Sequence, residues 1–306
     1  KTMIHGVINI YKEKGYTSHD VVAKLRGILH QKKIGHTGTL DPDAEGVLPV
    51  CLGSGTRLCD LLTDKDKTYR AVMLLGKETD TQDISGTVLR EMPVSVTEEQ
   101  VRKAAESFIG DYEQVPPMYS ALKVNGKKLY ELAREGKTVE RAARPVKILE
   151  LKIEKIELPR VTMTVTCSKG TYIRTLCHDI GLKLGICACM EKLDRIRVGS
   201  FIMEESLRLS EVEELQKQGE LEDHVIPVDQ MLKQYPALEM REGMDRFVYN
   251  GNPLFANQFA GTAAEKKISG WVRVYDTLGH FCGVYQYDSL KKRYQPVKMF
   301  LDWRNG

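Results

Sequence analysis

The chain has 306 residues, 42% of them hydrophobic and 28% charged, which is the balance of a globular protein with room for one large domain and a small one. It has no run of about 18 apolar residues and no signal-peptide pattern, so we expect no membrane span. Seven cysteines without the spacing of a disulfide framework favour a reducing cytoplasm. Because the formal net charge is only +3, a polyanionic partner would have to bind a local basic patch.

In chain order, the first predicted element is a helix capped by Ser18, whose apolar residues recur at helical spacing: Val21, Val22, Leu25 and Leu29. A segment rich in glycine and proline follows at residues 35–49. Residues 67–76 are rich in strand formers and end at a glycine, so they predict a strand. Thr97 and Gln100 form a capping-box pattern that opens a second helix, which ends before Gly110.

The second half mixes strands and helices without a regular β-α-β alternation. Residues 161–167 (VTMTVTC) alternate strictly and predict a half-buried strand. The turn at residues 168–170 leads into a helix through Leu176, which Gly185 stops. This mixture favours an α+β fold over a doubly wound sheet.

The last part of the chain has a different pattern. Ser210 and Glu213 form a capping box that predicts one more helix. Residues 271–288 then form two alternating strands around a short turn that contains glycine, and Pro236 supplies a plausible boundary before them. We therefore predict a large domain at residues 1–235 and a small all-β domain at residues 236–306.

The segment at residues 35–49 (GHTGTLDPDAEGVLP) holds Asp41 in an unusually constrained setting. Pro42 restricts Asp41 to extended backbone angles, and the glycines allow sharp turns or close approach to another chain segment: Gly35, Gly38 and Gly46. A carboxylate held in this way suits a nucleophile or a general base. The alternative is that Asp-Pro only starts a turn, as most such dipeptides do.

Residues 117–147 carry a local excess of positive charge. Eight basic and three acidic residues give this segment a net charge of +5, with Tyr119 and Tyr130 interleaved. Such a patch favours a polyanion, with nucleic acid first, although a charged and solvated helix and loop has the same composition.

Metal and nucleotide sites are not indicated. The cluster Cys177, His178, Cys187 and Cys189 lacks the paired C-x-x-C spacing of a zinc site, so these cysteines are expected to be structural. Residues 52–57 (LGSGTR) have two glycines but neither the P-loop lysine nor a dinucleotide fingerprint. His36, Tyr69 and Arg174 each have an ordinary structural explanation when taken alone.

Taken together, several segments resemble the TruB-type tRNA pseudouridine synthases, which isomerise a uridine in the T-loop of tRNA (position 55). They occur in the family's order over most of residues 6–185: GVINIYKEKGYTSHDVV, GHTGTLDPDAEGVLPVCLGSGTR, DKTYRAVMLLGKETDTQDISG, MYSALKVNGKKLYELAREG, RPV and CSKGTYIRTLCHDIGLKLG. The C-terminal β region is similar to the PUA domain that the family appends. One departure is Lys12-Glu13, where the family usually has Lys-Pro.

The resemblance implies a pseudouridine synthase fold: an α+β catalytic domain with a mixed, mainly antiparallel central sheet, followed by a PUA-like RNA-binding domain. It implies no cofactor and no metal. The partner it implies is the T-arm and T-loop of tRNA, and we expect a monomeric, cytoplasmic enzyme without membrane contact.

The resemblance also implies roles for individual residues. Asp41 falls on the family's nucleophile, and Arg174 on the arginine that favours its ionised form, with a guanidinium fork able to grip the carboxylate at two points. Tyr69 falls on the tyrosine that stacks on the target base and helps to remove the C5 proton. Tyr172 and Leu193 match positions that line the uracil pocket.

The target uridine has to leave its folded loop before it can react. His36 matches a histidine associated with that rearranged loop, so we expect it to bind substrate rather than act as a base. The resemblance assigns phosphate contacts to the basic segment, with these candidates: Lys123, Lys127, Lys128, Arg141 and Arg144. Supporting roles are expected for Lys12, Asp80 and Asp83. For the two aspartates, one such role is to orient Arg174.

Two other functions remain open on the sequence. One is the catalytic subunit of a guide-dependent RNA pseudouridylation complex, although the chain lacks the long basic tails that many of those proteins carry. The other is an RNA-binding protein without catalysis, against which the presence of Asp41, Tyr69 and Arg174 argues.

Overall fold

The computed structural model describes residues 3–261 and 268–305. Its largest element is a nine-stranded sheet in which the strands follow the order β1-β3-β12-β4-β11-β10-β7, with β2 added beside β3 and β13 beside β12. The strands are β1 (Gly6–Lys12), β2 (Ile34–His36), β3 (Glu45–Leu52), β4 (Lys67–Leu75), β7 (Gly110–Gln114), β10 (Arg144–Glu157), β11 (Arg160–Cys167), β12 (Ala188–Val198) and β13 (Phe201–Ile202).

All neighbours in this sheet are antiparallel except β3 and β12, which run parallel through the pairs Glu45–Asp194 and Gly46–Arg195. The predicted α+β class with a mixed, mainly antiparallel sheet is therefore confirmed. Both strands that were predicted within the sheet are present, as β4 and β11.

Helices cover the sheet in two groups, each with its own apolar core. Helices α3 and α5 pack on the part built from β4, β10, β11 and β12, whereas α1 and α6 pack on β1 and β3. The longer helices are α1 (Ser18–Leu29), α3 (Glu98–Glu106), α5 (Ile173–Lys183) and α6 (Leu209–Gln218), and the short ones are α2 (Cys59–Thr63), α4 (Leu129–Arg134) and α7 (Asp245–Tyr249).

Two of the three predicted helix caps are wrong by a residue or two. The cap of α1 is Thr17, which forms a capping box with Asp20, because the hydroxyl of Ser18 is buried and bonds to the backbone of Leu40 instead. Helix α6 begins earlier than predicted, after Arg208, with Glu211 as the third helical residue. The Thr97–Gln100 box at the start of α3 is confirmed.

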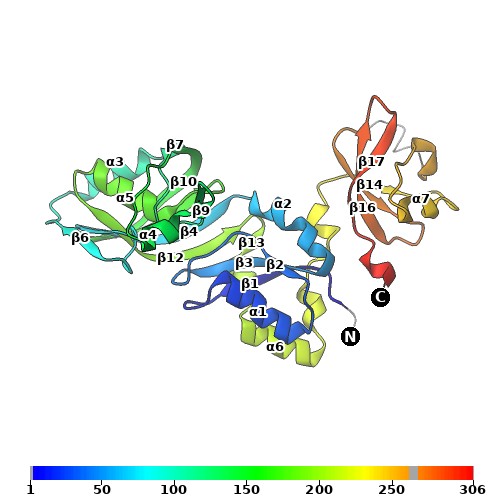
Figure 1. Cartoon of the computed structure of the whole chain (residues 1–306), viewed down its shortest axis with the longest axis horizontal. Coiled ribbons are helices and arrows are strands. Elements are labelled where there is room, and N and C mark those ends of the chain that lie inside the picture. The colour runs from blue at the N-terminus through cyan, green and yellow to red at the C-terminus, as the bar shows by residue number, and fades with distance from the viewer. Residues whose placement is uncertain (1–2, 262–267, 306) are drawn as a thin grey trace.

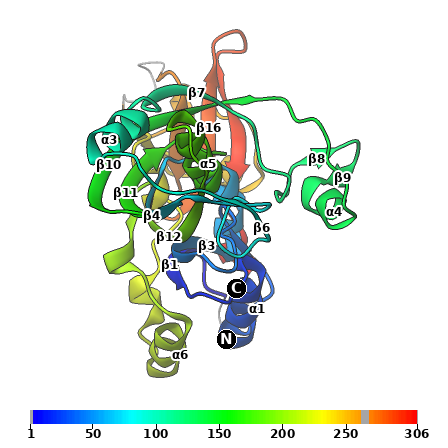
Figure 2. The same ribbon diagram turned by 90° about the vertical axis from the view of Figure 1, so that its left-hand side faces the viewer.

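Short elements complete this part of the chain. Two small hairpins are formed by β5 (Lys77–Thr79) with β6 (Val88–Glu91) and by β8 (Lys123–Val124) with β9 (Lys127–Lys128). Figure 2 shows that β8, β9 and α4 stand out from the rest of the molecule. Short 3-10 helices lie at η1 (Gly53–Leu58), η2 (Met203–Glu205), η3 (Leu221–His224) and η4 (Gln230–Leu232).

The C-terminal part forms a separate four-stranded sheet in the order β14-β15-β16-β17, to one side of the molecule in Figure 1. Its elements are β14 (Ala237–Glu239), β15 (Trp271–Tyr275), β16 (Phe281–Asp288) and β17 (Arg293–Met299), with α7 and η5 (Ala256–Gln258) between β14 and β15, and η7 (Asp302–Asn305) at the end. Val284 and Phe300 pack on Leu58 and Leu62 of the large part. No helix in residues 3–261 and 268–305 is long and apolar enough to cross a membrane.

Candidate active site

Asp41 lies in the loop between β2 and β3, and the backbone of this loop is held from several sides. The Leu40 N–H donates to Ser18 Oγ at 3.0 Å, the Ala44 N–H to the Asp41 carbonyl at 3.0 Å, and the Gly15 N–H to the Pro42 carbonyl at 2.8 Å. The Asp41 side chain nevertheless remains 49% exposed. The loop therefore presents a carboxylate at an open surface on a backbone that has little freedom.

The glycines of this loop are needed for two different reasons. Gly38 and Gly46 have φ of 70° and 114°, which residues with a side chain rarely adopt. A Cβ on Gly46 would lie 2.1 Å from the Arg195 carbonyl oxygen, and one on Gly35 would lie 3.3 Å from Cys59 Sγ. Turning and close approach, the two expected uses of glycine, are both present.

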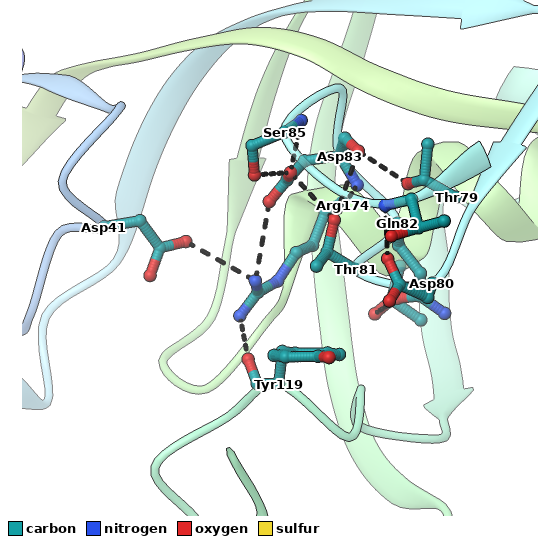
Figure 3. Close-up of polar contacts among 11 residues, drawn as sticks. Asp41, Thr79, Asp80, Thr81, Gln82, Asp83, Ser85, Tyr119 and Arg174 are labelled. Carbon is teal, nitrogen blue, oxygen red and sulfur yellow. Dashed lines mark hydrogen bonds and ion pairs between the residues drawn. The ribbon is translucent and has the colours of Figure 1, made fainter. Parts of the chain in front are cut away.

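Arg174 lies in the first turn of α5 and points at Asp41 from across the site (Figure 3). Its Nη1 is 3.9 Å from Asp41 Oδ2 and 3.7 Å from Asp83 Oδ2, and its Nη2 donates to the Tyr119 carbonyl at 2.5 Å. The expected two-point grip on Asp41 is therefore wrong for this structure. One nitrogen faces both carboxylates because the other is bound to the backbone at Tyr119.

Asp83 is held so that one oxygen faces Arg174. Its Oδ1 accepts hydrogen bonds from Ser85 N–H at 2.9 Å and from Thr81 Oγ at 2.9 Å, which leaves Oδ2 for the guanidinium. Asp80 does something else, because its Oδ1 accepts from the Thr87 N–H at 2.7 Å and closes the same hairpin. Of the two aspartates, the geometry relates only Asp83 to Arg174.

The aromatic and apolar candidates lie on neighbouring elements. Tyr69 is half-buried on β4, directly opposite Arg195 of β12, and burial raises its pKa. Leu193, two residues before Arg195, pairs with Ala71 of β4. Tyr172 caps the start of α5, and its ring centroid is 5.7 Å from the Arg174 guanidinium.

His36 ends β2 and is half-buried beside His19 of α1, with ring centroids 5.3 Å apart in an edge-to-face arrangement. Burial, and then the nearby His19 and Arg195, lower the pKa of His36. Its Nδ1 is buried and has no hydrogen-bond partner within residues 3–261 and 268–305. Sequence reasoning missed the role of His19, although it lies in the segment GVINIYKEKGYTSHDVV, because a contact between rings on two separate elements has no signal in the sequence.

Lys12 supports the loop from inside the protein. It is fully buried, and its Nζ donates to the carbonyls of Glu13, Tyr16 and Pro42 at 3.1, 2.6 and 3.2 Å. Burial lowers its pKa. Glu13 keeps its carbonyl in this cluster and directs its carboxylate to Arg208 at 2.6 Å, so the departure from the usual proline is accommodated.

Two further buried cations, Arg195 and Lys67, were missed. Arg195 is 1% exposed and donates from Nε to the Val47 carbonyl at 2.9 Å and from Nη2 to the Gly38 carbonyl at 3.0 Å. Lys67 donates to the carbonyls of Thr63 and Lys65, and burial lowers its pKa to about 8. Strand alternation could have found them, because it places Lys67 with Tyr69 and Arg195 with Leu193.

The basic candidates of residues 117–147 are not equivalent. Lys123, Lys127 and Arg144 are exposed. Lys128 is half-buried, with its Nζ 3.3 Å from the Tyr130 hydroxyl. Arg141 is engaged with the backbone, donating to the carbonyls of Pro116 and Val139 at 2.8 and 3.0 Å.

No group of three or more histidine, cysteine, aspartate or glutamate side chains in the described part of the chain could hold a metal ion. All seven cysteines are free thiols, and Cys177, Cys187 and Cys189 are buried, as their structural interpretation predicts.

Comparison with known proteins identifies the class of this protein as pseudouridylate synthase. The sequence model described as "TruB family pseudouridylate synthase (N terminal domain)" matches residues 26–173, and the one described as "tRNA pseudouridylate synthase B C-terminal domain" matches residues 174–233. The chain belongs to the TruB family.

Curated relatives agree over nearly the whole length. A protein of Lachnoclostridium phytofermentans named tRNA pseudouridine synthase B is 52% identical, over 97% of this chain and all of that protein. One of the same name from Bacillus pumilus is 42% identical, over 87% of this chain and 89% of that protein.

Solved structures give the same fold at lower identity. A chain of a Cbf5–Nop10–Gar1 complex has a TM-score of 0.72 and 28% identity, covering 98% of this chain and 86% of that one. A chain of an H/ACA RNP bound to a substrate RNA containing 2'-deoxyuridine has a TM-score of 0.70 and 26% identity, covering 97% and 85%.

Proposed function

We propose that the protein isomerises uridine to pseudouridine in the T-loop of tRNA, at position 55, with Asp41 as the nucleophile. Membership of the TruB family and relatives named tRNA pseudouridine synthase B support the reaction and the class of substrate. The observation that carries the site is the half-exposed Asp41 carboxylate facing the buried Arg174 guanidinium at 3.9 Å.

In the proposed reaction the Asp41 carboxylate attacks the flipped-out nucleoside at C1′ of the sugar or at C6 of the base. The bond between C1′ and N1 breaks, the uracil turns, C5 bonds to C1′, and the bond to Asp41 breaks, which restores the free carboxylate. The C5 proton then leaves while N1 gains one, so the change is an isomerisation that consumes no other reagent. The Arg174 guanidinium faces the Asp41 carboxylate at 3.9 Å, and Asp83 keeps the guanidinium in place at 3.7 Å.

Other residues hold the substrate. Tyr69 stacks on the base and assists removal of the C5 proton, and Tyr172 and Leu193 line the uracil pocket. His36, whose buried Nδ1 lacks a partner in the described part of the chain, binds the rearranged loop. Lys12 and Asp80 act indirectly, since they bond to the backbone of the Asp41 loop and of the 79–87 hairpin.

The basic segment, residues 117–147, grips the T-arm through phosphate contacts. Its exposed cations, Lys123, Lys127 and Arg144, are the main contacts, with Lys128 beside them, and Arg141 shapes the segment through its backbone bonds. Residues 1–235 form the catalytic domain and residues 236–306 a PUA-like domain that adds RNA contacts. The enzyme works as a monomer in the cytoplasm, where seven free thiols are stable.

A guide-dependent subunit remains the second candidate, because the solved neighbours come from H/ACA and Cbf5 complexes. Two observations favour the stand-alone enzyme. Identity rises from 28% against the Cbf5 chain to 52% against a protein named tRNA pseudouridine synthase B, and that protein is matched over its entire length.

Tritium release tests the proposal. Purified protein is mixed with a tRNA transcript that carries tritium at uridine C5, with no guide RNA, metal or nucleotide added. We expect wild type to release about one tritium per tRNA and Asp41→Asn to release none while binding tRNA within several-fold of wild type. Turnover by Asp41→Asn would refute the nucleophile, and tight binding without release by wild type would favour the guide-dependent or non-catalytic protein.

A further inference from the structure

One buried arginine touches the Asp41 loop on both sides of the nucleophile. Arg195 binds the carbonyl of Gly38, which precedes Asp41, and that of Val47, which follows it. The guanidinium is therefore a clamp that spans the two stems of the loop, and the loop between them carries Asp41.

The backbone of Arg195 holds the same loop a second time. Arg195 pairs with Gly46 where β12 runs parallel to β3, and its carbonyl oxygen would be 2.1 Å from a Cβ on Gly46. Main chain and side chain of one residue thus fix both ends of the loop, and this contact leaves no room for a side chain at position 46.

Arg195 also connects the loop to Tyr69. The two residues are directly opposed in the antiparallel pairing of β12 with β4, and the positive charge of Arg195 partly offsets the increase that burial causes in the Tyr69 pKa. The other groups that act on this phenol are Cys167 of β11 and Asp41 itself.

The charge of Arg195 has no carboxylate partner within 4 Å in residues 3–261 and 268–305, and its side chain donates to two backbone carbonyls, which are neutral. A buried cation without a counter-ion is costly unless its donors are well satisfied. Apolar side chains of similar size would fill the volume without that cost, but they could not bond to two carbonyls at once.

We propose that Arg195 is a positioning residue, which fixes the Asp41 loop relative to Tyr69 on the facing strand so that nucleophile and stacking group keep one relative placement. It differs from Arg174, which faces the Asp41 carboxylate itself. This inference rests on the proposed function for its kinetic consequence and on the structure alone for its effect on the loop.

Arg197 provides a matched control on the same strand. It donates to Thr68 Oγ at 3.0 Å and to the Gly199 carbonyl at 2.7 Å, so it also bonds a hydroxyl and a carbonyl, but it makes no bond to the Asp41 loop. Arg195→Met and Arg197→Met each replace an arginine by an uncharged side chain that cannot donate a hydrogen bond. Arg195→Lys keeps the positive charge, but its single ammonium cannot span both carbonyls as the guanidinium does.

The experiment has two readings. The first is hydrogen exchange of the free, full-length protein over residues 37–46, where the amides of Leu40 and Ala44 are hydrogen-bonded. The second is the single-turnover rate on the tritiated tRNA transcript, set against the dissociation constant of the same tRNA. Thermal melts show that each variant is folded.

We expect Arg195→Met to exchange faster over residues 37–46 and to turn over at least about tenfold more slowly, with tRNA affinity within about threefold of wild type. Arg195→Lys should lie between, and Arg197→Met should match wild type in both readings. Unchanged exchange in Arg195→Met, or tRNA affinity that falls in parallel with the rate, would overturn the inference.

The two proposals fail separately. If wild type isomerises no uridine, the proposed function is wrong, and the exchange of residues 37–46 decides the role of Arg195 by itself. If Arg195→Met does not fold, Arg195→Lys takes its place, and exchange equal to wild type in that variant would refute the clamp.

Discussion

Lys67 is a buried cation whose charge should make the stability of the protein depend on pH. It begins β4, two residues before Tyr69, and its Nζ bonds to the Thr63 and Lys65 carbonyls at 2.5 and 2.6 Å. Burial, and then repulsion from Arg195, lower its pKa from 10.5 to about 8. The folded protein therefore releases this proton at a lower pH than the unfolded chain does.

The sign and size of the effect follow from that difference. Between the two pKa values the unfolded chain binds more protons, so the free energy of unfolding rises with pH. A shift of about 2.5 units corresponds to about 3 kcal/mol in total, of which about 2.5 kcal/mol falls between pH 7 and pH 10. Lys67→Met has no such proton and should lack this component.

Urea denaturation of wild type and Lys67→Met at both pH values, with a thiol reductant present, measures the difference. Subtracting the variant cancels the many other groups that titrate in this range. Wild type should gain about 2.5 kcal/mol relative to Lys67→Met on going from pH 7 to pH 10. A stability difference between the two proteins that stays constant with pH would refute the reasoning.

Two further predictions concern the site and the basic segment. Asp83→Asn should slow single turnover by about tenfold to thirtyfold with little change in tRNA affinity, because Arg174 loses the carboxylate at 3.7 Å. The control variant Glu191→Gln, which changes the surface pair with Arg160, should turn over at the wild-type rate. An equal loss of rate in both variants would contradict the role of Asp83. Alanine at Lys123, Lys127 and Arg144 should reduce the slope of log affinity against log salt by about 2. Alanine at the exposed Lys152, Lys155 and Lys217 should leave that slope unchanged. Equal slopes for the two triple variants would show that the basic segment is only a solvated face.

Local patterns predicted local structure well. Strict alternation located β11, and the Thr97–Gln100 box located the start of α3, because both signals depend only on near neighbours in the chain. Ser18 misled the prediction for α1, since its hydroxyl turns inward to Leu40, a partner that lies in the Asp41 loop. A cap that bonds across the fold cannot be distinguished from an ordinary one by spacing.

The site needed more than local pattern. Pro42 and the glycines indicated a constrained Asp41, but only the family resemblance connected it with Arg174. The Tyr119 carbonyl and Arg195 contribute contacts that neither approach predicted, because backbone acceptors carry no sequence signal and the Arg195 contacts exist only where β12 lies beside β3. The two-point grip expected of Arg174 is absent because one of its nitrogens is bound to such a backbone acceptor, the Tyr119 carbonyl.

The parallel pairing of β12 with β3 also bears on when the protein becomes competent during its synthesis. Arg195 meets acceptors that are 148 and 157 residues away in the chain, among the longest connections in the main sheet. At typical translation rates a ribosome needs roughly ten to thirty seconds to add that stretch. Until then the segment around Asp41 lacks its neighbour, so the nascent chain contains the proposed nucleophile long before the contacts that hold its loop can form.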